Sequence, residues 1–248
     1  MITVAVIAVL SLNPIPQDSR YHLFVDNRTI FFTPNFFNVV SNLPFLLIGF
    51  LAVKKMVINQ LVIVNEFKLV YWVFFAGVIL VALGSGYYHL WPANHTLVWD
   101  RIPMTIVISS LLSIIIAEFI SQKLAKLILL PLLILGVSSV IYWYIGEKAG
   151  DGDLRFYALA QFLPMLIIAI VLILFKSDFT DSRAYWWVLL CYLIAKLFEH
   201  FDEVVYSLSG LISGHSIKHL FAAFGLWLLL LSFSNRNYKS SDFKEVFD

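Results

Sequence analysis

Seven apolar runs follow one another along the chain, each close to the length of about 20 residues that a helix needs to cross a bilayer. They cover residues 35–57, 69–88, 102–120, 124–145, 154–175, 185–201 and 217–233. Hydrophobic residues make up 60% of the sequence and charged residues 13%, whereas an average soluble domain is roughly 25% charged. The pattern predicts an all-α integral membrane protein built as a seven-helix bundle.

The connections between the runs leave no room for a separate soluble domain. We expect three parts: residues 1–33 as an apolar stub and an extracytoplasmic segment, 34–233 as the seven-helix domain, and 234–248 as a cytoplasmic tail. The stub itself is too short to span, because a helix over residues 1–12 would cover about 18 Å of a hydrocarbon core of about 30 Å. The formal net charge of +1 gives no basic field of the kind that binds nucleic acid.

Lysine and arginine are unequally divided between the two sides of the predicted membrane. The loops after the first, third and fifth runs and the tail hold Lys54, Lys55, Lys68, Lys123, Lys126, Lys176, Arg183, Arg236, Lys239 and Lys244. The other side holds only Arg20, Arg28, Arg101, Lys148 and Arg155. Because cytoplasmic loops carry the excess of positive charge, we expect a cytoplasmic C-terminus, in the inner membrane if the chain is bacterial.

Polar residues gather at the outer ends of three runs. Ser85 and His89 lie at the end of the second run, Asp100 precedes the third, and His215 and His219 lie at the start of the seventh. Side chains four residues apart share one helix face. Ionisable side chains near hydrocarbon are expensive and usually functional. Topology places these five residues on the same, extracytoplasmic side.

Three imidazoles suit a catalytic zinc site, because they leave the fourth tetrahedral position open. Zinc in such a site activates water at neutral pH. Asp100 could then accept a proton from water and pass it to a leaving amine, while Ser85 could donate a hydrogen bond to the oxyanion. The only cysteine, Cys191, excludes a cysteine-based zinc cluster.

Each residue also has a structural interpretation. Ser85 stands between Gly84 and Gly86, and small residues allow helices to pack closely in membranes. Asp100 could cap the third helix. Single histidines at helix ends are usually interfacial, which is how we interpret His22 and His95.

The motifs resemble those of one family. SGYYH at residues 85–89, then ten residues, then DRIPM at 100–104 resembles the S-x3-H-x10-D-x2-P-M pattern of the alkaline ceramidases. HSIKH at 215–219 resembles their H-x3-H at the start of the last span, and NVVSN at 38–42 resembles the N-x2-S-N that opens their first span.

The resemblance implies a seven-helix membrane fold with zinc at the outer ends of the second, third and seventh spans. His89, His215 and His219 would be the zinc ligands, Asp100 the water-activating carboxylate and Ser85 the oxyanion donor. The reaction implied is hydrolysis of the ceramide amide to a sphingoid base and a fatty acid. Receptors of the progestin/adiponectin type and haemolysin-III-like proteins share this kind of fold, so the fold alone does not define a function.

The N-terminal segment departs from the eukaryotic members of this family, which carry an acidic calcium site before the first span. Here Asp26 is followed by Asn27 and Arg28, and Asn35 stands where the family has a glutamate. The chain is therefore more similar to bacterial members whose substrates are uncharacterised, and we do not expect calcium.

The sixth run carries its own polar residues. Lys196, Glu199 and Glu203 are spaced to form one neutralising stripe on a helix. Asp202 is a candidate for orienting a ligand histidine, and Lys218 could extend to the interface.

Three functions fit these observations. The first is hydrolysis of ceramide or a related N-acyl lipid drawn from the bilayer. The second is a lipid esterase, using zinc or using Ser85 and His89 as a serine hydrolase, although no G-x-S-x-G elbow surrounds Ser85. The third is a receptor-like protein with structural zinc, in which the carboxylate of Asp100 would have no purpose.

Overall fold

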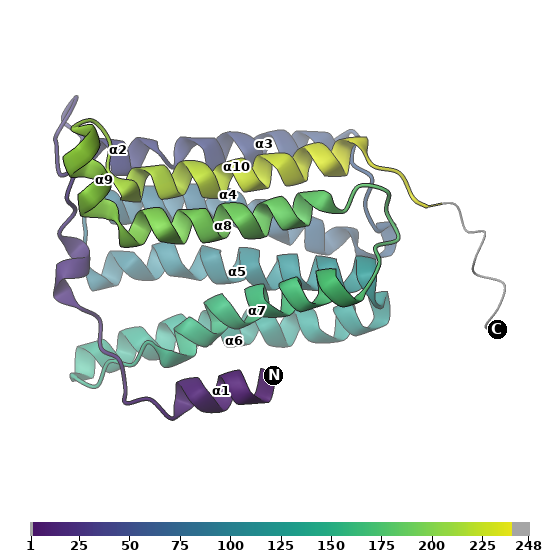
Figure 1. Ribbon diagram of the computed structural model, residues 1–248, viewed down its shortest axis with the longest axis horizontal. Helices are drawn as coiled ribbons and strands as arrows, with labels where there is room; N and C mark the ends of the chain where they lie inside the picture. The colour runs from purple at the N-terminus through teal and green to yellow at the C-terminus, as the bar shows by residue number, and fades with distance from the viewer. Residues whose placement is uncertain (1, 240–248) are drawn as a thin grey trace.

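The computed structural model describes residues 2–239, and within them it is built from helices. The helices are α1 (Ile2–Leu10), α2 (Phe36–Val40), α3 (Leu43–Val57), α4 (Lys68–Leu90), α5 (Asn94–Phe119), α6 (Gln122–Ala149), α7 (Arg155–Leu174), α8 (Arg183–His200), α9 (Asp202–Ser209) and α10 (Gly214–Asn235). Two 3-10 turns lie at Ser19–His22 and Asn65–Phe67. The long helices run along one common direction (Figure 1). At one end of the bundle lie α2, α9 and residues 17–35, called the N-terminal segment below, and at the other end lie residues 236–239, called the C-terminal segment.

Six helices in the described chain are long and apolar enough to cross a membrane. They are Phe36–Val57, Asn65–Leu90, Asn94–Phe119, Gln122–Ala149, Arg155–Leu174 and Gly214–Asn235. This confirms an all-helical fold in the described residues, with several helices that are able to span a membrane. The expected sixth run does form a helix, α8, but Arg183, Lys196 and Glu199 within it leave it outside this group, so its crossing stays a prediction.

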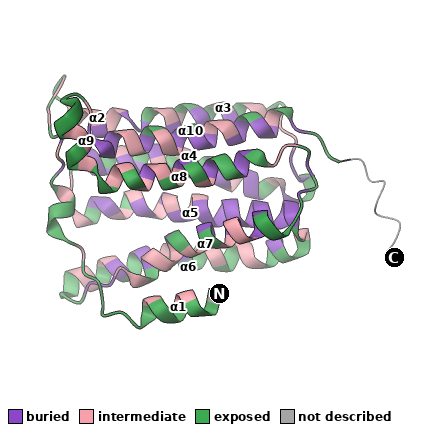
Figure 2. Ribbon diagram, viewed as in Figure 1, coloured by how far each residue is buried: buried purple, intermediate pink, exposed green. Residues whose placement is uncertain are grey.

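The outer faces of the bundle are apolar. Exposed residues alternate with buried ones along α3 and α8 (Figure 2). Large exposed side chains include Leu47, Leu127, Leu135, Ile173 and Leu193. These apolar surfaces suit the hydrocarbon core of a membrane better than water, which is consistent with contact to a lipid bilayer.

The central helix of the bundle is α5. Of its most apolar stretch, 72% is buried inside the protein, against 22% for α6 at the periphery. The helix begins at Asn94, well before residue 102 where the sequence predicted the span, because Thr96 pairs with the backbone at Ala93 and caps the helix there. Asp100 is therefore inside α5, and the interpretation of Asp100 as its cap is wrong.

The N-terminal stub forms α1, which lies beside α7 (Figure 1). Arg155 at the start of α7 donates to the carbonyl oxygens of Leu10 and Leu12 and forms a 2.8 Å ion pair with Asp153. This ion pair keeps the pKa of the Asp153 carboxyl below its ordinary value.

The predicted tail begins later than residue 234, since α10 continues to Asn235. Arg236–Lys239 then fold back against the end of the bundle, where the Tyr238 hydroxyl donates to the Ile63 carbonyl at 2.9 Å. The remainder of the predicted tail, residues 240–248, lies outside the described residues.

A fully enclosed ion pair holds this end of the bundle together. Arg236 binds both carboxylate oxygens of Glu118 at 2.8 and 2.6 Å, and neither side chain is exposed. The hydroxyls of Tyr71 and Tyr185 donate to the same carboxylate at 2.6 and 2.7 Å, so α4, α5, α8 and the end of α10 meet there.

Removing one partner of this pair should destabilise the protein severely. We expect Glu118→Ala to lower the free energy of unfolding by about 3–5 kcal/mol, because Arg236 would be left as an uncompensated buried charge. Asp181→Ala is the matched control, since Asp181 pairs with Arg183 at an exposed site and such pairs contribute about 0–1 kcal/mol. Unfolding in denaturing detergent measures both variants, and equal losses would contradict the prediction.

The contact between α4 and α5 depends on Gly84. A Cβ atom at this position would overlap the carbonyl oxygen of Trp99, whereas a Cβ at Gly86 would meet nothing within 4 Å. The glycine that permits close packing is therefore Gly84, and the interpretation of Ser85 as a packing residue is not needed. This contact places Ser85 on α4 beside Asp100 on α5.

Two glycine-to-alanine variants test this contact. Gly84→Ala should destabilise the protein by about 1–3 kcal/mol through overpacking. Gly86→Ala should be neutral or stabilising by up to about 1 kcal/mol, because alanine is the better helix former. The same unfolding assay compares them, and a harmless Gly84→Ala would show that the helices are not in tight contact at this point.

Candidate metal centre

The structure brings the three predicted histidines together. His89 lies in the last turn of α4, and His215 and His219 lie in the first two turns of α10. All three are buried, and one ring nitrogen of each lies within 4.8 Å of the others. The Nε2 atoms of His89 and His215 are 3.4 Å apart, close to the roughly 3.3 Å between two nitrogens on one tetrahedral zinc ion.

Ser41 is placed to hold His219 in the tautomer that binds a metal. The Ser41 hydroxyl lies 3.1 Å from the Asn38 carbonyl, to which it can donate its single proton. Its oxygen is then free to accept the Nδ1–H of His219, 2.8 Å away. In that tautomer the Nε2 atom of His219 carries the lone pair, which is the arrangement that a metal ligand requires.

Further hydrogen bonds hold the backbone around the histidines. The Asn35 side chain donates to the His89 carbonyl at 2.8 Å, and the Asp202 carboxylate accepts the backbone N–H of His215 at 2.7 Å. Asp202 therefore anchors the start of α10 through the backbone of His215, and its role in orienting a ligand ring stays a prediction. Burial raises the pKa of the Asp202 carboxyl above its ordinary value.

Asp100 and Ser85 lie beside this cluster. Both line the same cavity as His219, and the close contact at Gly84 brings the backbone of Asp100 next to the turn of α4 that carries Ser85. Within residues 2–239, Asp100 takes part in no ion pair. Its carboxylate is therefore available for proton transfer.

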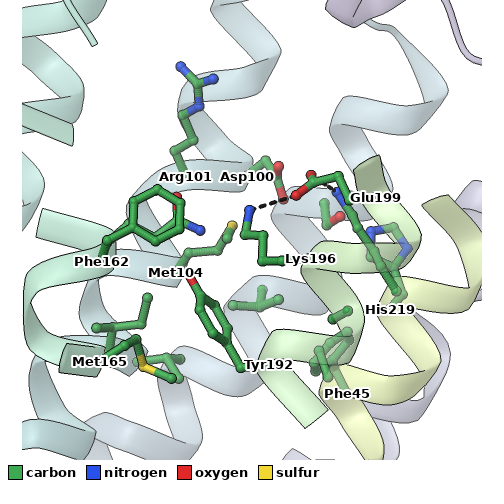
Figure 3. A pocket seen from close by; sticks show the side chains of 18 of the residues that line it. Phe45, Asp100, Arg101, Met104, Phe162, Met165, Tyr192, Lys196, Glu199 and His219 are labelled. Atoms are coloured by element: carbon green, nitrogen blue, oxygen red, sulfur yellow. Dashed lines mark hydrogen bonds and ion pairs between the residues drawn. The ribbon is translucent and has the colours of Figure 1, made fainter. Parts of the chain in front are cut away.

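The cavity has a volume of about 370 Å³ and a polar end next to the histidines (Figure 3). Away from that end its walls are apolar and include Phe45, Ile108, Leu111, Met165 and Leu226. Leu111 lies about three turns beyond Asp100 on α5, which is about 16 Å along the helix. A cavity of this shape suits an amphipathic molecule with a polar group near the histidines and an alkyl chain along the helices.

The charged residues of α8 differ from the expected stripe. Glu199 accepts hydrogen bonds from both Lys196 and Lys218 at 2.6 Å, so Lys218 is held inside the bundle and does not extend to the interface. Figure 3 shows Lys196 reaching toward Glu199 at the polar end of the cavity. Glu203 belongs to α9, a separate helix, because the chain turns at Phe201.

The N-terminal segment covers the outer side of the histidines. The centroid of the Phe24 ring lies 4.7 Å from that of the His89 ring and 5.2 Å from that of the His215 ring. His22 bonds the Tyr88 hydroxyl and the Asn94 side chain, so it links this segment to α4 and α5 and is not merely interfacial. The Asp26 carboxylate forms an ion pair with Arg28 at 2.8 Å.

Sequence reasoning missed several polar groups of the cavity. In the part of the chain that the structure describes, the Asn42 Oδ1, the Gln161 Nε2 and the Tyr192 hydroxyl are buried without a hydrogen-bond partner. Gln161 is the single amide side chain in the run 154–175, which is a signal that could have identified it. Asn42 belongs to the NVVSN motif, but no role followed from the motif alone.

Comparison with known proteins finds no relative of this chain, because no family model, no curated protein and no solved structure matches it. The resemblance to alkaline ceramidases therefore depends on the motifs alone and stays a hypothesis.

The hydrogen bond from His219 to Ser41 gives a direct test of the metal centre. We expect Ser41→Ala to weaken zinc affinity by about 10- to 100-fold, as loss of a residue that orients a ligand typically does. Ser207→Ala, at an exposed position on α9, is the control and should change nothing. Competition with a chromophoric chelator measures the affinity. Equal affinity in both variants would remove Ser41 from the metal centre.

Proposed function

We propose that this protein is a membrane-embedded amide hydrolase that binds zinc through His89, His215 and His219 and cleaves ceramide or a related N-acyl lipid. One observation supports the proposal above all. His219 of the histidine cluster, the carboxylate of Asp100 and the hydroxyl of Ser85 line the polar end of a cavity whose remaining walls are mainly apolar. A bound zinc ion would supply the Lewis acidity that activates water at neutral pH.

Two side chains of the site would transfer the proton and stabilise the developing negative charge. Asp100 takes the proton of the attacking water and later delivers it to the nitrogen of the leaving amine. Ser85 donates a hydrogen bond to the substrate oxygen, where negative charge develops. The products are a fatty acid and a sphingoid-type amine. Glu199 is a poorer proton acceptor than Asp100, because two lysines already hold its carboxylate.

The other functions have less support. Among the described residues Ser85 donates no hydrogen bond to His89, whose Nε2 faces His215, so a serine hydrolase lacks its base. A receptor-like protein with structural zinc would need neither Asp100 nor a cavity beside the metal. A zinc esterase would use the same groups, and only a substrate comparison separates it from an amidase.

The site lies at the end of the bundle opposite the C-terminal segment (Figure 1). With the positive residues on the cytoplasmic side, the proposal places hydrolysis on the extracytoplasmic side of the membrane.

Asp100→Asn tests the proposed chemistry. We expect this variant to keep its zinc and to lose about 10²- to 10⁴-fold in turnover, the usual contribution of general acid–base catalysis. Zinc content and hydrolysis of a panel of ceramides, other N-acyl lipids and matched esters are measured on the purified protein. His219→Ala should lose both zinc and turnover, and chelated protein should recover on addition of zinc.

Asp178→Asn, exposed at the opposite end of the bundle, is the control and should behave as the wild type. Amide hydrolysis that persists without metal would exclude the zinc mechanism. Stoichiometric zinc without turnover of any lipid would favour the receptor-like alternative. Hydrolysis of esters alone would identify an esterase.

A further inference from the structure

Asn42 occupies the break between α2 and α3, at one wall of the cavity. It is 2% exposed and lines the cavity together with Ser85, Asp100 and His219. Ser41 and Asn42 keep right-handed helical dihedral angles, and Pro44 lies in the first turn of α3, where a missing backbone N–H costs nothing. The Asn42 side chain is thus part of the same corner as the metal centre, next in sequence to the Ser41 that orients His219.

The orientation of the Asn42 amide group is determined by its own hydrogen bonds. Its Nδ2 donates to the Asn38 carbonyl at 2.8 Å and to the Val39 carbonyl at 3.5 Å. Its Oδ1 is buried and has no partner within residues 2–239. An acceptor that is buried next to a binding cavity and left unpaired is costly, so we expect a ligand to supply the missing donor.

The proposed substrate contains one such donor at its reacting group. A secondary amide has an N–H, whereas an ester of the same shape has none. A trans amide points its N–H and its carbonyl oxygen in opposite directions. An acceptor between α2 and α3 and a donor on α4 can therefore hold the two ends of the group at once, with Asn42 on the N–H and Ser85 on the oxygen.

We propose that the Asn42 Oδ1 accepts a hydrogen bond from the N–H of the scissile amide and so selects secondary amides over esters and tertiary amides. The inference rests on the proposed function and deepens it, because it assigns the preference for an amide to one side chain. A site built to hydrogen-bond a substrate N–H discriminates against analogues that lack it, since its own polar group is then left unpaired.

The test uses zinc-loaded, full-length protein in detergent micelles and three ligands with identical alkyl chains. These are a secondary N-alkyl fatty amide, its N-methyl derivative and the matching ester. Equilibrium binding and kcat/KM are measured for the wild type, Asn42→Leu, Asn42→Ala and Leu43→Ala. Leu43 is 54% exposed and serves as the neighbouring control. Zinc content and the thermal midpoint identify any variant that fails to fold, and two substitutions at Asn42 guard against that case.

We expect both Asn42 variants to lose about 10- to 100-fold in binding and kcat/KM for the secondary amide, a range typical of an unpaired buried polar group. The ester and the N-methyl amide should change by less than about threefold. Leu43→Ala should leave all three ligands unaffected.

Equal losses for all three ligands would show a structural role only and would overturn the inference, as would no loss for any of them. If the wild type binds amides without hydrolysing them, the proposed function fails, while the binding ratios still decide the role of Asn42. Absence of any amide binding would overturn both.

Discussion

A polar side chain inside a membrane bundle has no water to bond, so it must find its partners within the protein or in a ligand. The two ends of this bundle meet that requirement in opposite ways. At the end near the C-terminal segment, the Glu118 carboxylate is fully used by Arg236, Tyr71 and Tyr185. At the other end, histidine nitrogens, Asp100 and Asn42 converge on a cavity with hydrogen-bonding capacity left over. The contrast is what distinguishes a structural cluster from a site.

The central position of α5 makes that convergence possible. Because most of this helix is enclosed by its neighbours, Asp100 reaches the cavity from the middle of the bundle. The close contact at Gly84 sets the register between α4 and α5. Ser85 and His89 are then carried to Asp100 on one side, while α10 brings the other two histidines. The close packing of α4 on α5 at Gly84 thus also fixes the position of the Asp100 carboxylate relative to Ser85 and His89.

Much of this arrangement could be predicted from the sequence. Each apolar run forms a helix, and helical spacing together with topology was enough to place Ser85, His89, Asp100, His215 and His219 at one end. Long periodic segments are the most dependable part of such an analysis. The ends of helices were less accurate, as at α5, where a cap at Ala93 extends the helix beyond its apolar run.

Contacts between residues far apart in the sequence could not be predicted from the sequence. Nothing in the spacing of Ser41 indicates a hydrogen bond to His219, and nothing in the charge of Lys218 indicates that Glu199 will hold it inside the bundle. Both contacts depend on how the end of α2, α8 and α10 pack, which periodicity does not encode.

The residues that cover the candidate metal centre determine what can reach it. On the outer side, Phe24 packs against two of the histidines, and His22 closes the segment onto α4 and α5. On the inner side, the cavity continues along apolar side chains of α3, α5, α7, α8 and α10. A water-soluble amide would gain nothing from those walls. Under the proposed function, a lipid amide would bury its chain there while its polar group reaches Asp100, Ser85 and Asn42, and the apolar walls of the cavity would favour lipids over water-soluble amides.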